Sequence, residues 1–85
     1  MLAWRAKAWE EYLEWQRTDK AVVTKINELI KECLRHPFEG KGKPELLKSN
    51  FSGYWSRRIT NEHRLVYKVE KDLITITQCR YHYEK

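Results

Sequence analysis

The feature that most constrains the fold is a change of hydrophobic period at His36 and Pro37. Before these residues, apolar side chains recur at intervals of three and four, which indicates amphipathic helices. After them, short β-branched and aromatic segments alternate with turn residues, which indicates strands. The pattern predicts an α+β fold, in which two N-terminal helices pack on one face of a twisted antiparallel β-sheet and leave the other face open.

The helical half is expected to contain two helices. The first is expected over residues 6–16, with Trp9, Tyr12, Leu13 and the stem of Gln16 on its apolar side. Thr18 or Asp19 is a suitable N-cap for the second helix, which should end before Pro37 because the residue before a proline disfavours helical backbone. The apolar stripe of the second helix consists of Val22, Ile26, Leu29, Ile30 and Cys33.

The remaining segments read as strands joined by a loop and short turns. Residues 1–4 are expected to form an edge strand, and residues 38–45 form a loop rich in glycine, lysine and proline. The other strands are expected at residues 46–48, 54–59, 64–69 and 73–80. All of residues 1–85 are assigned to a single domain, because a chain of 85 residues can bury only one small core.

The composition favours a polyanionic partner. The chain has 17 Lys and Arg residues against 12 Asp and Glu residues, a net charge of +5, which attracts nucleic acid first and anionic membranes second. No apolar run approaches the roughly 18 residues of a membrane span, and no signal-peptide pattern opens the chain, so a cytoplasmic location is expected. Cys33 and Cys79 lack metal-ligand spacing and are read as free thiols.

Several basic and acidic residues of the second half could form a site on the open face. The loop at residues 40–43 is either a solvated connector or a basic contact for a phosphate backbone. Glu45 follows Pro44, where the loop enters β structure, although a lone surface glutamate is the commoner reading. Arg57 and Arg58 are neighbours on one strand, so only one of them can point to the open face.

Arg64 and the C-terminal tail add two further candidates. A guanidinium at Arg64 could stabilise the charge of a phosphorane-like transition state, or it could serve solubility or pair with Glu62 or Glu70. His82 lies between Tyr81 and Tyr83, and imidazole can donate or accept a proton near neutral pH. Tyrosines flanking a histidine must be buried or stacked, and they can stack on unpaired bases. His36 and His63 are read as structural.

Taken together, these residues resemble the YoeB/Txe family of toxins within the RelE-like superfamily. The similarity covers nearly the whole chain. The motifs that carry it are Trp9–Gln16 and Asp19–Ile30 in the first half, and then Lys41–Glu45, Leu47-Lys48, Ser52–Ile59, Glu62–Tyr67 and Tyr81–Tyr83.

The resemblance implies a ribosome-dependent endoribonuclease that cleaves mRNA without a metal or other cofactor. The residues at the family's catalytic positions are Glu45 as general base, Arg64 as phosphate-stabilising arginine and His82 as general acid. The residues at its substrate-binding positions are Lys48, Arg58 and Tyr83. Glu84 and Lys85 extend beyond the point where members of this family often end.

The resemblance also implies partners, and other function classes stay open. A cognate antitoxin of the YefM/Axe kind is expected to inhibit the protein, and the ribosome with its mRNA is the expected target. No membrane partner is expected, and the aromatic side chains near Trp9 and Trp15 are candidates for a homodimer contact. The alternatives are a superfamily toxin that acts on DNA gyrase and a non-catalytic basic module that only binds RNA.

Overall fold

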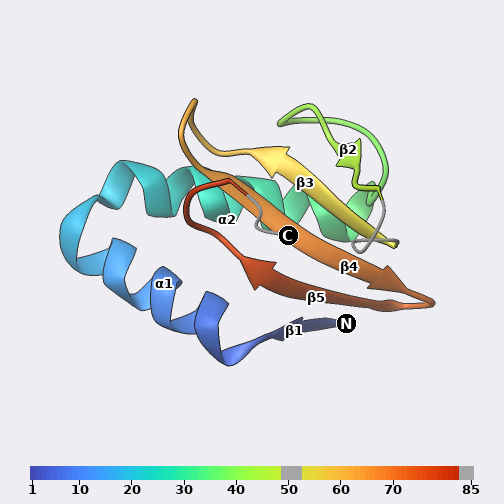
Figure 1. The fold of residues 1–85 in the computed structure, drawn as a ribbon, viewed down its shortest axis with the longest axis horizontal. Helices are drawn as coiled ribbons and strands as arrows, with labels where there is room; N and C mark the ends of the chain where they lie inside the picture. The colour runs from blue at the N-terminus through green and yellow to red at the C-terminus, as the bar shows by residue number, and fades with distance from the viewer. Residues whose placement is uncertain (49–52, 83–85) are drawn as a thin grey trace.

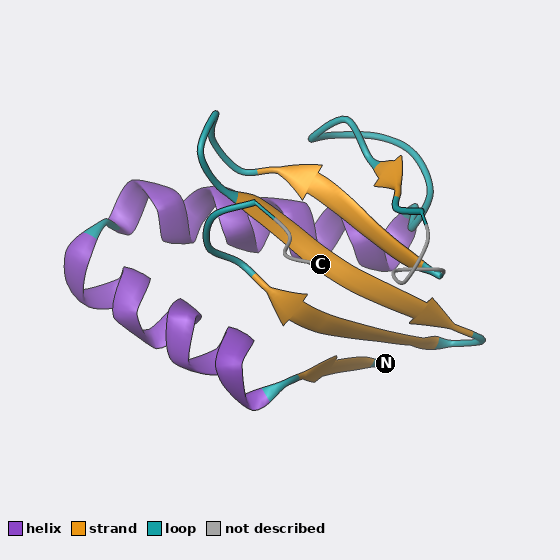
Figure 2. Ribbon diagram, in the orientation of Figure 1, coloured by secondary structure: helices purple, strands orange, loops and turns teal. Residues whose placement is uncertain are grey.

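The computed structural model describes residues 1–48 and 53–82, which form two helices and a five-stranded sheet (Figures 1 and 2). In chain order the elements are β1 Leu2–Trp4, α1 Ala6–Thr18, α2 Lys20–Arg35, β2 Glu45–Leu46, β3 Tyr54–Arg58, β4 Arg64–Glu70 and β5 Leu73–Gln78. The helix α2 lies across one face of the sheet (Figure 1). Within the described residues, neither helix is long and apolar enough to cross a membrane.

The sheet has the strand order β1-β5-β4-β3-β2, and its last four strands form the predicted antiparallel meander. The first strand, β1, runs parallel to β5, with Leu2 opposite Ile74 and Trp4 opposite Ile76, so the complete sheet is mixed. The α+β fold class is confirmed. The predicted strands agree with the observed ones to within two residues, although β2 is shorter and begins one residue earlier than expected.

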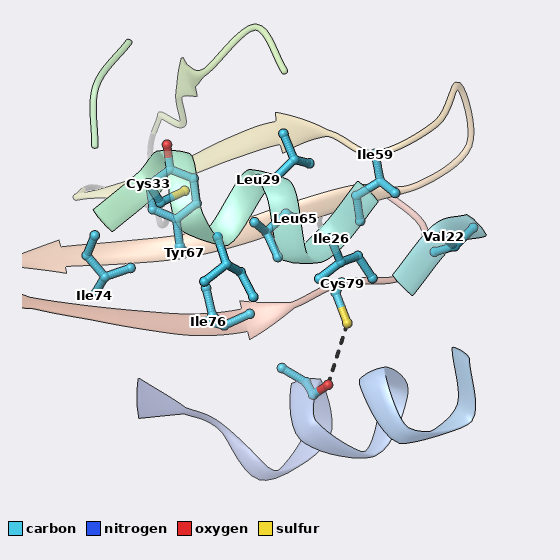
Figure 3. Close-up of a cluster of buried hydrophobic side chains, with 12 residues drawn as sticks. Val22, Ile26, Leu29, Cys33, Ile59, Leu65, Tyr67, Ile74, Ile76 and Cys79 are labelled. Atoms are coloured by element: carbon cyan, nitrogen blue, oxygen red, sulfur yellow. Dashed lines mark hydrogen bonds between the residues drawn. The ribbon is translucent and has the colours of Figure 1, made fainter. Parts of the chain in front are cut away.

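The helix α2 forms as its sequence predicts. The carboxylate of Asp19 caps it by accepting hydrogen bonds from the backbone N–H groups of Ala21 (3.1 Å) and Val22 (3.2 Å). All five residues of the predicted apolar stripe are buried, and the helix ends at Arg35. Figure 3 shows Ile26, Leu29 and Cys33 of this stripe in one buried cluster with side chains from β4 and β5, namely Leu65, Tyr67, Ile74 and Ile76.

The buried side of α1 differs from the prediction. Trp9 and Leu13 are each 44% exposed, whereas Ala8 is fully buried and Tyr12 and Trp15 pack partly against the core. The small side chain of Ala8 lets the helix backbone approach the end of β5, where the Cys79 thiol reaches the Ala8 carbonyl at 3.5 Å (Figure 3). The prediction was therefore right for Tyr12 but wrong for Trp9, Leu13 and Gln16, because the close approach of helix and sheet selected alanine rather than a larger side chain.

A buried arginine ties the sheet to the loop that precedes β2. Arg57 is fully buried on the helix side of β3, and its Nε donates to the hydroxyl of Tyr67 at 2.9 Å. Its remaining bonds go to loop carbonyls, those of His36, Glu39 and Lys41, the last two at 2.8 Å. Arg58 is exposed on the opposite face, which confirms that only one of the two arginines reaches the open side.

Replacing Arg57 with methionine should destabilise the domain strongly. Methionine fills a similar volume but leaves three partly buried loop carbonyls and the Tyr67 hydroxyl without their donor. Hydrogen bonds to a charged donor are worth about 1.5–3 kcal/mol each, so we expect Arg57→Met to lower the free energy of unfolding by about 3 kcal/mol or more. Urea denaturation measures this loss.

The matched control is Arg58→Met on the exposed neighbour. It should change the free energy of unfolding by no more than about 0.5 kcal/mol. Equal losses for the two variants would contradict the role assigned to the Arg57 guanidinium.

Candidate functional site

The strand register brings three of the predicted site residues to one face of the sheet. Directly paired residues share a face, and Glu45 pairs with Ser56 while Arg58 pairs with Arg64. Since Ser56 and Arg58 are two residues apart on β3, all four side chains point away from α2. We call this side the open face and define it by Glu45, Ser56, Arg58, Arg64, Val66 and Gln78.

The open face is not uniformly exposed. Ser56 and Val66, the small residues in the middle of this face, are only 3% and 2% exposed. Glu45 and Arg58 at its rim are exposed, and Arg64 is half-buried. The face therefore combines a buried floor of small side chains with long charged side chains around it.

A β-bulge turns Gln78 toward this face. The register of β4 and β5 shifts between Val66 and Tyr67, so that Val66 pairs with Gln78 and Tyr67 with Ile76. Ile76 points into the core, and regular alternation would send Gln78 there as well. The extra residue, Thr77, reverses the alternation, and its hydroxyl bonds to the Val66 carbonyl at 3.2 Å.

The tail that follows β5 is tied down over the open face. The side-chain amide of Gln78 donates to the carbonyls of Arg80 (2.8 Å), Tyr81 and His82. The backbone N–H of Arg64 donates to the Tyr81 carbonyl at 2.9 Å, at the beginning of β4. In Figure 1 the described part of the tail correspondingly turns back along β4. These bonds bring His82, whose side chain is exposed, beside the face that carries Arg64 and Glu45.

Helix α1 contacts the first two residues of the same tail, Cys79 and Arg80. The indole N–H of Trp15 donates to the Cys79 carbonyl at 2.9 Å, and a carboxylate oxygen of Glu11 accepts from the Cys79 N–H at 2.8 Å. The guanidinium of Arg80 lies over the Trp15 ring, 5.6 Å from its centroid. The tail thus leaves β5 in a direction fixed by both the helix and the sheet.

Arg64 is oriented by the turn that precedes it. Its Nη1 donates to the carbonyls of Thr60 (2.7 Å), Asn61 (3.2 Å) and His63 (3.1 Å). Because these three bonds use the same nitrogen, they fix the guanidinium through one side of its fork. A fixed guanidinium is suited to the planar recognition of phosphate oxygens.

Glu45 is positioned by the loop that Arg57 anchors. The loop approaches β3 closely, and the Gly42 carbonyl accepts a hydrogen bond from the Arg58 N–H at 2.7 Å. Gly42 has a φ of +86°, and a Cβ there would lie 2.7 Å from Leu29 Cδ2 and 3.1 Å from Arg57 Cβ. After Pro44, Glu45 joins the sheet opposite Ser56, at one end of the row Glu45, Ser56, Val66 and Gln78.

The predicted site residues thus fall into three groups. The register and the tail bring Glu45, Arg58, Arg64 and His82 to one side of the sheet. Lys48 is exposed, but β2 ends at Leu46 and strand alternation does not assign Lys48 to a face. Tyr83, with Glu84 and Lys85, lies outside the described residues.

Three supporting residues were not among the predicted site residues, although His63 was expected to be structural. Arg57 anchors the loop, Gln78 binds the tail carbonyls, and the imidazole Nδ1 of His63 accepts from the Tyr81 N–H at 2.7 Å. Of these three, only Arg57 could have been recognised from the sequence as a buried residue, because strand alternation places it and Arg58 on opposite faces. The contacts of Gln78 and His63 depend on a bulge and a tail conformation that no residue pattern specifies.

The two cysteines belong to the core rather than to the site, and both are free, as the sequence predicts. Burial raises the pKa of the Cys33 thiol to about 11 and that of the Cys79 thiol to about 12. Both thiols therefore stay protonated at neutral pH and are poor nucleophiles.

The chain is similar to known bacterial toxins over nearly its whole length. The family model for YoeB-like toxins of bacterial type II toxin–antitoxin systems matches residues 4–83. The toxin YoeB of Escherichia coli (strain K12) is 65% identical over 82 residues, which cover 96% of this chain and 98% of that protein. The solved YoeB/ParE toxin from Agrobacterium tumefaciens superposes with a TM-score of 0.93 at 52% identity and covers 96% of this chain and 98% of its own.

Structures from Staphylococcus aureus show two assemblies of similar proteins. A heterotetrameric YoeB–YefM toxin–antitoxin complex contains a chain with a TM-score of 0.90 and 51% identity, covering 98% of this chain and 97% of that one. A YoeB dimer gives a TM-score of 0.89 at 52% identity, covering 96% of this chain and 95% of that one.

The fold is thus that of a toxin of a bacterial type II toxin–antitoxin system. Within that class, the chain belongs to the YoeB-like toxin family. The family resemblance predicted from the sequence is confirmed.

Substituting Gly42 should disturb the loop that leads to Glu45. Gly42→Ala forces a Cβ against the core side chain of Leu29 in a backbone conformation that favours glycine, whereas Gly53, with a φ of +84°, has no described atom within 4 Å of the corresponding position. We expect Gly53→Ala to cost about 1 kcal/mol of unfolding free energy from backbone strain alone. Gly42→Ala should cost about 1–3 kcal/mol more because of overpacking.

Urea denaturation of the two variants measures the difference. The comparison separates contact from strain, since both glycines have nearly the same φ. Identical losses would mean that the loop does not pack against Leu29 and Arg57 in solution.

Proposed function

We propose that this toxin is a ribosome-dependent endoribonuclease that cleaves mRNA by acid–base transesterification. The observation that supports the proposal is the shared open face of Glu45, Arg58 and Arg64, with the tail that bears His82 hydrogen-bonded beside it. A carboxylate, two guanidinium groups and an imidazole are the groups that such a reaction at an RNA phosphate requires.

In the first half of the reaction, Glu45 acts as the general base. Its carboxylate takes the proton of a ribose 2′-hydroxyl, and the resulting oxygen attacks the adjacent phosphorus. A bond forms between O2′ and phosphorus, and negative charge builds up on the non-bridging phosphate oxygens. Arg64 neutralises this charge with the N–H donors that its turn contacts do not use, and Arg58 and Lys48 assist it.

In the second half, His82 acts as the general acid. Its imidazolium gives a proton to the departing 5′-oxygen as the bond between phosphorus and O5′ breaks. The products are a 2′,3′-cyclic phosphate and a 5′-hydroxyl end. Tyr83, the next residue, orients the substrate in this scheme.

The dimensions of the open face are compatible with this division of labour. Glu45 and Gln78 stand at opposite ends of a row that crosses three strand spacings, about 14 Å in all. In the proposed scheme, one phosphodiester binds between side chains that extend inward from the two ends. The small residues Ser56 and Val66 keep the floor of the row low.

The proposed partners follow from charge and from similar proteins. A YefM-like antitoxin would inhibit this toxin, as the S. aureus complex suggests, and acidic antitoxin segments would complement a chain of net charge +5. The rings of Trp4, Trp9 and Tyr12 contact one another, with ring centroids 4.8–5.7 Å apart, and Leu13 nearby is exposed. This surface is suited to a homodimer like that of the S. aureus toxin. Action on ribosomes assigns the protein to the cytoplasm.

Isosteric substitution of the two proton-transfer residues tests the mechanism. Glu45→Gln and His82→Gln should each lower the rate of ribosomal mRNA cleavage by roughly 10²–10⁴-fold, since each removes one proton transfer. Neither should unfold the domain, because both side chains are exposed. Primer extension on a message translated by purified ribosomes measures the rate.

Matched controls are the same substitutions away from the open face. Glu28→Gln and His36→Gln change exposed residues on α2 and at its end, and both should cleave at the wild-type rate. Wild-type rates for both Glu45→Gln and His82→Gln would rule out the assigned roles. Salt-sensitive RNA binding by the wild type without cleavage would indicate a binding module, and gyrase inhibition without mRNA cleavage would indicate the other toxin class.

A further inference from the structure

We infer that His63 is a positioning residue whose unprotonated Nδ1 holds the tail in the conformation that presents His82. The inference rests on the proposed function, because the consequence of the tail conformation is measured as mRNA cleavage. His63 itself lies in the turn before β4 and is half-buried.

The donor and the acceptor of this hydrogen bond are both defined. Nδ1 of His63 accepts the backbone N–H of Tyr81 at 2.7 Å. A backbone N–H can only donate, so the hydrogen bond exists only while Nδ1 carries no proton. His63 must therefore act as an acceptor, whereas the proposed role of His82 is that of a proton donor.

The imidazole of His63 is fixed on the sides that face the tail and α1. The Trp15 ring meets it edge-on, with the ring centroids 4.8 Å apart and an interplanar angle of 78°. The Tyr81 ring is tilted against the imidazole by 46°, with the ring centroids 5.3 Å apart, and the Arg80 guanidinium lies over that tyrosine, 5.0 Å from its centroid. The backbone N–H of His63 donates to the Thr60 hydroxyl at 3.1 Å, which anchors the turn below the ring.

Tyr81 needs such an anchor because its backbone is strained. Its φ is +59°, in the left-handed region that a residue with a large side chain adopts at a cost of about 1–3 kcal/mol. Such a conformation persists only when its surroundings enforce it. Here the N–H is held by His63, and the carbonyl is held by Arg64 and Gln78.

The strained residue directly precedes His82, so its conformation sets the direction of the catalytic side chain. If the His63 bond is lost, Tyr81 can relax out of the left-handed region and swing His82 away from the phosphate. Misplacement of a catalytic group by about 1 Å can cost on the order of 10²-fold in rate. Loss of His63 should therefore reduce cleavage through His82 rather than through substrate binding.

The test compares two substitutions of His63. His63→Leu removes the acceptor and should lower the single-turnover cleavage rate by about 10–10²-fold, while the ribosome concentration at half-saturation stays unchanged. His63→Asn supplies an amide oxygen close to the position of Nδ1 and should restore most of the wild-type rate. Equal losses for His63→Leu and His63→Asn would overturn the acceptor role, and so would a wild-type rate for His63→Leu.

A double variant distinguishes positioning from general damage to the fold. If His63 acts through His82, His63→Leu should cost little more in a protein that already carries His82→Gln. The same fold-loss in both backgrounds would mean that His63 supports the domain in general, and the inference would fail.

Hydrogen exchange of the Tyr81 amide tests the contact without a cleavage assay. It can be measured on the wild-type protein, so the test does not depend on how well a variant folds. NMR of the wild-type protein should show this amide protected, with protection kept in His63→Asn and lost in His63→Leu. A rapidly exchanging Tyr81 amide in the wild type would overturn the inference. A wild type that does not cleave mRNA would instead contradict the proposed function, while the exchange measurement would still report on the contact.

Discussion

The buried guanidinium of Arg57 is the interaction on which the geometry of the site depends. A charged group at this depth is tolerated only when its donors are satisfied, and those of Arg57 bond to Tyr67 on β4 and to three carbonyls of the loop before β2. The same bonds fix where the loop meets the sheet and therefore where Glu45 enters it. The positive charge of Arg57 thus serves the fold on one face of β3, while its neighbour Arg58 is exposed on the other face beside Arg64.

The two faces are linked by the alternation of β structure. A slip of one residue in β3 would expose Arg57 and bury Arg58, so the cost of burying an unpaired charge specifies the register that groups the site residues. At β5 the alternation is broken once, by the bulge at Thr77, which sends Cys79 into the core and Gln78 to the open face. Separate contacts therefore fix the two chain segments. The bonds of Arg57 fix the loop that leads to Glu45, and the bonds of Gln78 fix the tail that carries His82.

Much of this architecture could be predicted from the sequence because it follows from local patterns. The stripe and cap of α2, the meander and the opposite orientations of Arg57 and Arg58 depend on periodicity and capping alone. The apolar side of α1 could not be predicted in this way, since the close approach at Ala8 depends on the tertiary packing of β5. The tail contacts of His63 and Gln78 likewise depend on a bulge and a left-handed residue. The resemblance to a family supplied the roles of Glu45, Arg64 and His82, which patterns alone left open.

In the proposed mechanism, a carboxylate and an imidazole flank one RNA phosphate and use the neighbouring 2′-hydroxyl as the nucleophile. Analysis of the ends left on a translated message, with and without a single 2′-deoxynucleotide at the cut position, tests it most directly. We expect a 2′,3′-cyclic phosphate and a 5′-hydroxyl on the unmodified message, and an intact bond at the deoxy position. Cleavage at the deoxy position, or ends bearing a 3′-hydroxyl and a 5′-phosphate, would contradict it.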